Sequence, residues 1–224
     1  EFFYEYHSNE SENPDHVLFH ALGAWRVRSA YHDILWNPAF LMVAYQLLGT
    51  GFRLFHDQLF SKPAKHGSVV AWHQDYSYWT WTTPMSHLTC WMGLDDADTE
   101  NGCMYYVPGS HCWGLLEKKS LAGDMDAIRE SLTSDQITQF DNKVPVEMKA
   151  GEASFHHPLL MHGSYENRSD RSRRATLINV FSDGVVSNLE DDGINAPGAD
   201  NYPRVPKGRA MNGDYYPLLL EPNK

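Results

Sequence analysis

The stretch Val69-Val70-Ala71-Trp72-His73-Gln74-Asp75 joins an apolar, β-branched run to one imidazole and one carboxylate. Such a run is typical of a buried β-strand. Because residues i and i+2 of a strand point to the same face, we expect His73 and Asp75 to reach one cation together. An imidazole and a carboxylate suit Fe(II), and a second, distant histidine would complete a two-His-one-carboxylate triad.

The tripeptide His73-Gln74-Asp75 is a weak signal when it is taken alone. The chain contains 12 histidines and 29 acidic residues, so a histidine two positions before an aspartate is expected by chance, as with any short motif. The alternative interpretation is a histidine at the end of a strand beside a solvated aspartate in a turn. Residues far downstream decide between the two interpretations.

Composition indicates one globular domain without a polyanionic partner. The 224 residues are 42% hydrophobic and 13% aromatic, which is enough for a sizeable core and for the walls of a pocket. We therefore expect residues 1–224 to form a single domain. The formal net charge of −11 disfavours nucleic acid and anionic membrane surfaces as partners, because both are negatively charged.

The three cysteines, Cys90, Cys103 and Cys112, are odd in number and form no CxxC pair. This pattern fits reduced thiols in a cytoplasmic protein better than a disulfide framework or a zinc ribbon. No apolar run approaches the ~20 residues that a membrane-spanning helix needs. The chain begins at Glu1-Phe2-Phe3, with neither a methionine nor a signal-like stretch, so we expect further residues to precede it.

Residues 15–48 are expected to be helical, because their apolar side chains recur at helical spacing. We predict two helices in this part, and the helical spacing begins with Val17, Leu18, Ala21 and Leu22. Asn37-Pro38 fits an N-cap followed by proline at the start of the second helix, and Gly49 fits its end.

From Phe52 onward, short strands alternate with turn residues, which predicts a mainly β fold with flanking helices. The expected core is a double-stranded β-helix, or cupin-like jelly roll, over residues 52–182. Leu88 to Leu94 and Cys103 to His111 are predicted to pair as a hairpin across an acidic turn. We expect the polar insertion from Glu117 to Phe140 to form a lid, and residues 183–224 to be an irregular C-terminal segment.

A second group of candidate site residues lies near the end of the predicted core. His162 ends an apolar run at Gly163, where a side chain can face an open cavity. Arg173 begins the next strand after a polar turn, so the two flanking strands are expected to pair as a hairpin and to bring His162 and Arg173 together. Arginine pairs bidentately with carboxylates, so Arg173 suits the far end of a dicarboxylate whose near end binds the metal.

Three motifs together resemble the phytanoyl-CoA dioxygenase-like family of Fe(II)/2-oxoglutarate-dependent oxygenases. The resemblance covers roughly residues 52–181. Its motifs are Trp72-His73-Gln74-Asp75, Glu100-Asn101-Gly102-Cys103 followed by Val107-Pro108-Gly109-Ser110-His111, and His157-Pro158-Leu159-Leu160-Met161-His162-Gly163-Ser164 with Arg173.

The resemblance implies a function and a role for each matching residue. His73, Asp75 and His162 would bind Fe(II), and Arg173 would bind 2-oxoglutarate; these four residues are the predicted catalytic set. Further contacts to 2-oxoglutarate are implied for Ser164, Trp91 and Gln58. The implied reaction uses O2 to hydroxylate a small organic molecule while 2-oxoglutarate is decarboxylated to succinate and CO2.

Other functions share parts of this pattern. An enzyme of the same class could desaturate, cyclise or halogenate its substrate, a cupin-like protein could bind a metal or small molecule without catalysis, and a barrel-shaped hydrolase could use zinc. Asp75 disfavours halogenation, because the resemblance implies that halogenases of the family lack the acidic ligand. The intact set of four disfavours a non-catalytic protein. Of the neighbouring histidines, His156 shares the strand parity of His162, and His157 is predicted to lie in the core or behind the ligands.

Overall fold

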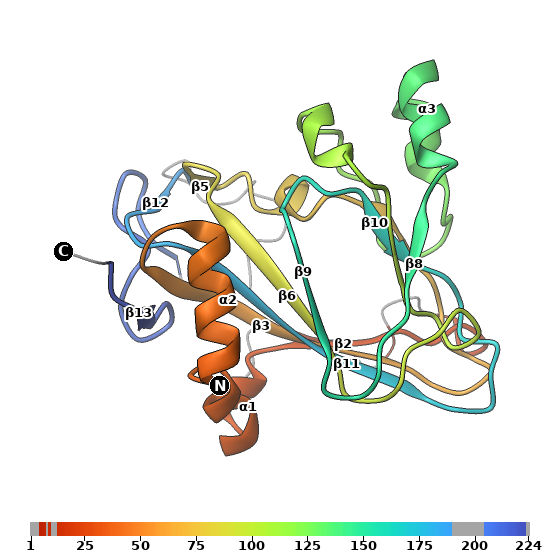
Figure 1. Ribbon diagram of the computed structural model, residues 1–224, viewed down its shortest axis with the longest axis horizontal. Helices are drawn as coiled ribbons and strands as arrows, with labels where there is room; N and C mark the ends of the chain where they lie inside the picture. Colours follow the sequence, from red (N-terminus) through yellow and green to blue (C-terminus); the bar gives the residue numbers. More distant parts are fainter. Residues whose placement is uncertain (1–4, 8, 10–12, 190–203, 223–224) are drawn as a thin grey trace.

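The computed structural model describes residues 5–7, 9, 13–189 and 204–222, and its strands form two main antiparallel sheets (Figure 1). This arrangement confirms the predicted mainly β, jelly-roll fold with flanking helices. The larger sheet has the order β1 (Glu5–His7), β2 (Phe19–Leu22), β3 (Phe52–Lys62), β11 (Arg173–Ser182), β6 (His87–Gly93) and β9 (Ala153–His156), and β13 (Leu218–Leu220) also pairs with β3. The smaller sheet has the order β4 (Val70–His73), β10 (His162–Ser164), β7 (Met104–Tyr106) and β8 (Val144–Val146), and β5 (Thr82–Thr83) pairs separately with β12 (Val186–Ser187).

The two faces of strand β11 serve two different cores. Because side chains alternate along a strand, Ile178 and Val180 pack under helix α2 (Pro38–Leu48). Ala175 and Leu177 point the other way and pack with residues of the smaller sheet, such as Val70 and Met104. The space between the two sheets is therefore lined by the inner faces of β3, β6 and β11 on one side and of β4, β7 and β10 on the other.

The N-terminal part differs from the prediction in its first element. Residues Phe19–Leu22 form strand β2, which pairs with β3, so the helix predicted from the spacing of Val17, Leu18, Ala21 and Leu22 is wrong. The spacing of the four apolar residues is helical, but residues 19–22 pair with the edge of β3 instead, so tertiary pairing overrode the local pattern. The helices are α1 (Ser29–Ile34) and α2. In α2 the predicted signals are confirmed, because the Asn37 side chain accepts from the amide of Ala39 at 2.9 Å and Gly49 ends the helix with a positive φ of 74°.

The predicted hairpin of Leu88 to Leu94 with Cys103 to His111 is also wrong. Strand β6 belongs to the larger sheet and β7 to the smaller one. The acidic turn between them crosses from one sheet to the other, and its carboxylates pair outside the turn. Asp95 binds the guanidinium of Arg174 at 2.7 Å, and Asp98 binds that of Arg171 at 2.6 Å.

The C-terminal segment is less irregular than expected, although residues 190–203 lie outside the described residues. Strand β12 pairs with β5, and β13 adds to the edge of β3. Met211 and Tyr216 are buried against Phe55 and Phe181. Short elements that complete one end of the core therefore lie among the Asn, Gly and Pro residues that suggested an irregular tail.

The polar insertion between β7 and β8 stands against strand β4. It contains three short helices, η3 (Ser110–Trp113), η4 (Ala127–Ser131) and α3 (Ser134–Phe140), and α3 begins with a capping box of Thr133 and Gln136. The amide of Ala71 donates to Leu121 O at 2.8 Å, and the amide of Trp72 donates to Met125 O at 3.2 Å. The insertion therefore covers the outer edge of the strand that leads to His73.

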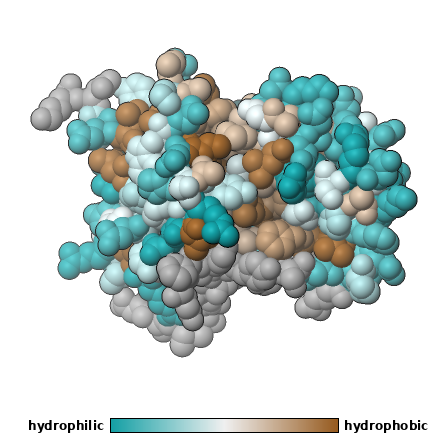
Figure 2. Space-filling view, turned by 90° about the horizontal axis from the view of Figure 1, so that it is seen from below, coloured by the Kyte–Doolittle hydropathy of each residue, from teal (hydrophilic) through white to brown (hydrophobic). Residues whose placement is uncertain are grey.

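The surface is mixed in polarity. On the face in Figure 2, hydrophobic residues gather nearer the middle, whereas the right-hand end is mostly hydrophilic. Among the described helices, none combines the length and apolar character that crossing a membrane requires. The three cysteines are free thiols.

A buried carboxylate, that of Asp57, fixes the turn that follows β2. Its two oxygens accept from the amides of Gly23 at 2.9 Å and Trp25 at 2.8 Å, so they satisfy the start of helix η1 (Ala24–Arg26). Burial raises the pKa of Asp57 to about 6. The folded chain therefore holds this proton more tightly than the unfolded chain does.

We predict that Asp57 makes stability fall as pH rises from about 4 to about 6. Its contribution is fully present below the unfolded pKa of ~3.9 and is lost through the folded pKa, which corresponds to about 3 kcal/mol for a shift of ~2 units. In Asp57→Asn, which does not titrate, the free energy of unfolding should change less over this range. Urea unfolding at pH 4.5 and pH 7 measures the difference, and an equal pH dependence in both proteins would contradict the prediction.

Candidate metal centre

Strand pairing brings the two predicted histidine ligands together. In the smaller sheet β10 runs antiparallel to β4, and His162 lies directly opposite His73. Strand β4 ends at His73, and Asp75 begins the short helix η2 (Asp75–Tyr78). The strand therefore does not extend to Asp75 as predicted, but Gln74 keeps an extended backbone (φ −114°, ψ 130°). As a result, the side chain of Asp75 still reaches His73.

The side chains of His73, Asp75 and His162 converge on one point. Each offers a ligand atom, and these atoms lie within 4.8 Å of one another. Asp75 Oδ1 is 3.6 Å from His73 Nε2 and 3.5 Å from His162 Nε2. All three residues are buried. Two imidazole nitrogens and one carboxylate oxygen at this separation fit a single transition-metal ion.

Backbone carbonyl groups set the orientation of both imidazoles. His73 Nδ1 lies 2.7 Å from Ala71 O, and His162 Nδ1 lies 2.8 Å from Leu160 O. Because a carbonyl oxygen can only accept, each Nδ1 carries a proton and donates. Each Nε2 is then the unprotonated nitrogen that a metal requires, and it faces Asp75.

The charge states of the three side chains also suit a cation. Burial disfavours the ionised carboxylate, yet nearby His162 and the hydrogen bond with His156 hold the pKa of Asp75 well below its usual value. Burial, with His73 beside it, lowers the pKa of His162 well below its usual value. One anion and at least one neutral imidazole are therefore available at neutral pH.

A second polar subsite surrounds Arg173, which is buried at the start of β11. Its Nε donates to Gly102 O at 3.1 Å, and its Nη2 donates to Ser164 Oγ at 3.0 Å. The guanidinium carbon lies 5.5 Å from the centre of the Trp91 ring. Three of the residues predicted to contact 2-oxoglutarate, Arg173, Ser164 and Trp91, are thus adjacent.

The route by which Arg173 reaches Ser164 differs from the predicted one. Strand β10 pairs with β4 and β7, and β11 pairs with β3 and β6. The predicted hairpin between the strands of His162 and Arg173 is therefore wrong. The two strands belong to opposite sheets, and Arg173 meets Ser164 across the space between them.

Lys62 is a buried residue of this subsite that the sequence reasoning missed. Its Nζ donates to Ser164 O at 3.0 Å, to Ser164 Oγ at 2.6 Å and to Tyr165 O. Burial, with Arg173 nearby, lowers the pKa of Lys62 well below its usual value. Within the described residues no carboxylate forms a salt bridge with Lys62 or Arg173. Strand parity was the signal that could have found it, since Lys62 shares a face of β3 with Gln58 and Phe60.

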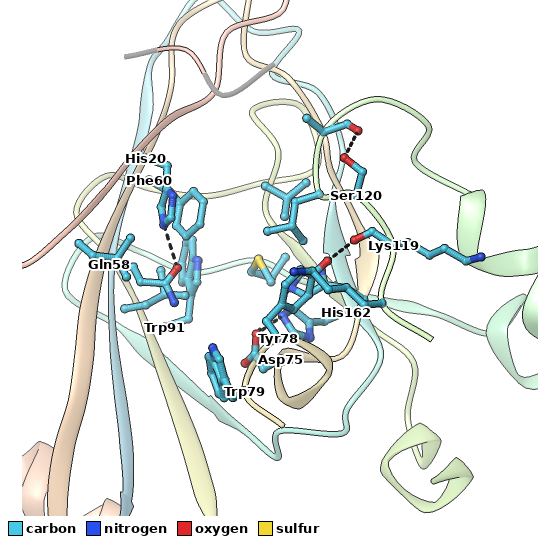
Figure 3. Close-up of a pocket in the computed structure, with 18 of the residues that line it drawn as sticks. His20, Gln58, Phe60, Asp75, Tyr78, Trp79, Trp91, Lys119, Ser120 and His162 are labelled. Atoms are coloured by element: carbon cyan, nitrogen blue, oxygen red, sulfur yellow. Dashed lines mark hydrogen bonds and ion pairs between the residues drawn. The ribbon is translucent and has the colours of Figure 1, made fainter. Parts of the chain in front are cut away.

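The candidate metal ligands line one cavity of about 590 Å³ together with Arg173 and Trp91 of the second subsite (Figure 3). Gln58 lies in its wall, where its amide bonds His20 Nε2 at 3.1 Å and His56 Nε2 at 2.8 Å. Its lining residues come from both sheets, from η2 and from the insertion: His20, Leu22, Gln58, Phe60, Val70, His73, Asp75, Tyr78, Trp79, Trp91, Met104, Lys118, Lys119, Ser120, Leu121, Ala122, His162, Arg173 and Leu177.

The aromatic residues near the site divide between cavity and core. Tyr78 and Trp79 line the cavity, whereas Trp72 packs in a separate core with Phe140. The Tyr78 hydroxyl donates to Lys119 O, so η2 is tied to the part of the insertion that lies over the cavity (Figure 3).

Of the two neighbouring histidines, His156 contacts the candidate ligands and His157 does not. His157 is exposed and contacts the exposed His111 with ring centres 5.5 Å apart, so its predicted place in the core or behind the ligands is wrong. His156 is buried, and its Nε2 lies 3.1 Å from Asp75 Oδ2. The strand parity that His156 shares with His162 was the sequence signal that distinguished His156 from His157.

Comparison with known families identifies one match. The family model for phytanoyl-CoA dioxygenase matches residues 3–175. A phytanoyl-CoA dioxygenase from Arabidopsis thaliana is 35% identical over 162 residues, which are 69% of this chain and 53% of that protein. An L-proline trans-4-hydroxylase from Streptomyces griseoviridis is 27% identical over 193 residues, which are 76% of this chain and 72% of that protein. The chain spans about half the length of several curated relatives that it matches.

Among solved structures, a non-heme alpha ketoglutarate-dependent carbocyclase, SnoK from nogalamycin biosynthesis, has a similar fold. The TM-score is 0.78 at 24% sequence identity, and the alignment covers 94% of this chain and 79% of that one. This similarity supports the jelly-roll architecture.

We predict that the chain binds one divalent metal at His73, Asp75 and His162. After anaerobic loading with Fe(II) and gel filtration, the wild-type protein should retain one ion per chain, whereas Asp75→Ala and His162→Ala should retain none. His111→Ala is the matched control, because this exposed histidine is remote from the triad, and it should retain the metal. Circular dichroism should show that all variants are folded. Full metal retention in His162→Ala would rule the site out.

Proposed function

The chain belongs to the phytanoyl-CoA dioxygenase family, and we propose that it is an Fe(II)/2-oxoglutarate-dependent dioxygenase that hydroxylates a small organic molecule. In this proposal, Fe(II) provides a site where 2-oxoglutarate and O2 react, so that 2-oxoglutarate is converted to succinate and CO2. The observation that carries the proposal is that a metal-binding triad and a buried cationic subsite open into the same cavity.

The cationic subsite favours a ligand with a second carboxylate. Lys62 and Arg173 are both buried and both donate to Ser164 Oγ. Burying the Arg173 guanidinium without an anionic partner is unfavourable, so a carboxylate that reaches Arg173 from the cavity gains a strong interaction. A dicarboxylate such as 2-oxoglutarate can place one end at Arg173 and the other at the metal triad.

The Ser164 hydroxyl can bind a carboxylate without leaving its present hydrogen-bond acceptor unpaired. It donates to Gly102 O at 2.8 Å. Gly102 O also accepts from Arg173 Nε, so the hydroxyl proton can rotate toward an incoming carboxylate while this carbonyl stays hydrogen-bonded. We propose that Ser164 and Arg173 bind the distal carboxylate, with Trp91 beside it and Gln58 in the adjoining wall.

The remaining walls leave room for an organic substrate. A cavity of about 590 Å³ lies within the range of ~300–1,000 Å³ that small-molecule sites occupy. Leu22, Phe60 and Trp79 provide apolar surface, and His20 provides a polar group. The segment Lys118–Ala122 lies over the cavity, where it can exclude bulk water during the reaction.

The reduced cysteines favour a cytoplasmic location, which stays a prediction.

A second candidate function is a different oxidative outcome in the same site. The structural relative SnoK is a carbocyclase, so the same fold accommodates ring closure. The L-proline trans-4-hydroxylase is the observation that favours hydroxylation. Asp75 continues to disfavour halogenation, and the charged, buried subsite disfavours a non-catalytic protein.

The activity is tested by measuring succinate release over a panel of small molecules. The reaction is started with O2 after anaerobic addition of Fe(II) and 2-oxoglutarate, and mass spectrometry identifies the product. A mass increase of one oxygen atom in the substrate is expected, and loss of two hydrogens would indicate desaturation or cyclisation instead. Activity that survives thorough chelation of metal would refute the proposal.

We predict that Arg173→Ala weakens 2-oxoglutarate binding by roughly thirtyfold to several thousandfold. Truncation removes a buried charged partner, which typically costs about 2–5 kcal/mol, and ~1.4 kcal/mol corresponds to a factor of ten. Arg173→Lys should lose less, because the charge remains while the planar fork is lost. The charge-transfer absorbance of the anaerobic Fe(II) complex, titrated with 2-oxoglutarate, measures the affinity.

The matched control is Arg174→Ala, because this neighbouring arginine is exposed and pairs with Asp95 on the surface. It should bind 2-oxoglutarate as the wild type does. Affinity for Fe(II) alone should change little in any of the three variants. Equal 2-oxoglutarate affinities for Arg173→Ala and wild type would refute the role of Arg173.

A further inference from the structure

The two oxygens of Asp75 have different surroundings. Oδ1 faces the nitrogens of His73 and His162. Oδ2 accepts from Thr89 Oγ1 at 2.6 Å and lies 3.1 Å from His156 Nε2. A carboxylate oxygen has about two acceptor positions, so two donors occupy Oδ2 fully. Oδ1 is left as the oxygen that can bind a metal.

Thr89 belongs to a hydrogen-bonded chain with a direction. It pairs with Asn179 across β6 and β11, and both side chains are fully buried. Thr89 Oγ1 is 2.8 Å from Asn179 Oδ1 and 2.6 Å from Asp75 Oδ2, but one hydroxyl proton cannot serve two acceptors. Asn179 Nδ2 has no hydrogen-bond partner in the described part of the chain. Exchanging the amide oxygen and nitrogen leaves the shape unchanged and lets Asn179 donate to Thr89, which then donates to Asp75.

His156 reaches the same oxygen from the other side. Its Nδ1 lies 3.2 Å from the Tyr106 hydroxyl, which is 2.7 Å from Ser154 Oγ. Because Nε2 must carry a proton to donate to Asp75, Nδ1 accepts from Tyr106. The chain of donors therefore runs from Ser154 through Tyr106 and His156 to Asp75.

We propose that Thr89 and His156, supported by Asn179 and Tyr106, are positioning residues that hold Asp75 as a one-oxygen ligand of the metal. The inference rests on the metal centre of the proposed function. With three protein ligand atoms, a metal held here would keep open positions for its co-substrates. A carboxylate that turned to bind through both oxygens would fill a position that these co-substrates need.

Thr89→Val tests the proposal because it removes the hydroxyl and keeps the shape. Co(II) binding is followed by its visible absorbance, and affinity should fall about 10–100-fold, the usual effect of losing a partner of a metal ligand. The Co(II) spectrum should also change, since Asp75 is free to bind through both oxygens. Thr89→Ser, which retains the donor, should restore both affinity and spectrum.

The second pair of variants, His156→Gln and His156→Phe, tests the other donor. An amide can still donate to Asp75, so His156→Gln should bind Co(II) more tightly than His156→Phe. Thr176→Val is the matched control, because Thr176 is buried on β11 and lies on the opposite face from Asn179. It should leave Co(II) affinity and spectrum unchanged, and thermal unfolding reports whether each variant is folded.

The outcomes separate this inference from the proposed function. Wild-type affinity and an unchanged spectrum in a folded Thr89→Val or His156→Phe would overturn the positioning role and leave the metal site standing. Absence of Co(II) binding in the wild type would overturn both. A loss in Thr89→Val that Thr89→Ser does not restore would also overturn the role, since the donated hydrogen bond would not be its cause.

Discussion

The site depends on keeping one carboxylate, that of Asp75, ionised inside the protein. Burying an anion is strongly unfavourable unless donors and opposite charges surround it. Here the protein provides two donors at one oxygen, Thr89 and His156, and directs the other oxygen at two imidazoles. A metal ion would supply the positive charge that His162, whose pKa is lowered by burial, does not. The hydrogen bonds that stabilise the buried carboxylate therefore also orient its other oxygen for metal binding.

The cationic subsite presents the complementary problem. Lys62 and Arg173 are buried and share the hydroxyl of Ser164, and their remaining contacts there are backbone carbonyl groups such as Gly102 O. The dipoles of these carbonyl groups stabilise the buried side chains but do not neutralise a positive charge. The Asp75 carboxylate and the Arg173 guanidinium therefore carry opposite charges at two points of one cavity. A molecule with a metal-binding end and a carboxylate end satisfies both at once.

The jelly roll is suited to this task because its two sheets supply the two halves of the site. The smaller sheet carries His73 and His162 on adjacent strands, and the larger sheet carries Thr89, Asn179 and Arg173. The main-chain hydrogen bonds of each sheet hold its residues rigidly, and the helices and the insertion cover the outside. The third candidate ligand, Asp75, comes from the start of η2, directly after β4, and the segment Lys118–Ala122 lines the cavity beside it.

The sequence alone determined the elements with strong local signals, the strand before His73 and the capped helix α2, and it predicted the candidate ligand set from motifs shared with a known family. It did not determine which strands pair, because apolar alternation is the same in either sheet. For this reason two strand pairs were mistaken for hairpins, whereas β2 was mistaken for a helix because its apolar residues and those before it have helical spacing. Lys62, Thr89 and Asn179 have no motif, and only the tertiary structure showed that they meet Ser164 and Asp75. Their roles come from burial next to a charge, and burial is a property of the packed sheets and not of local sequence.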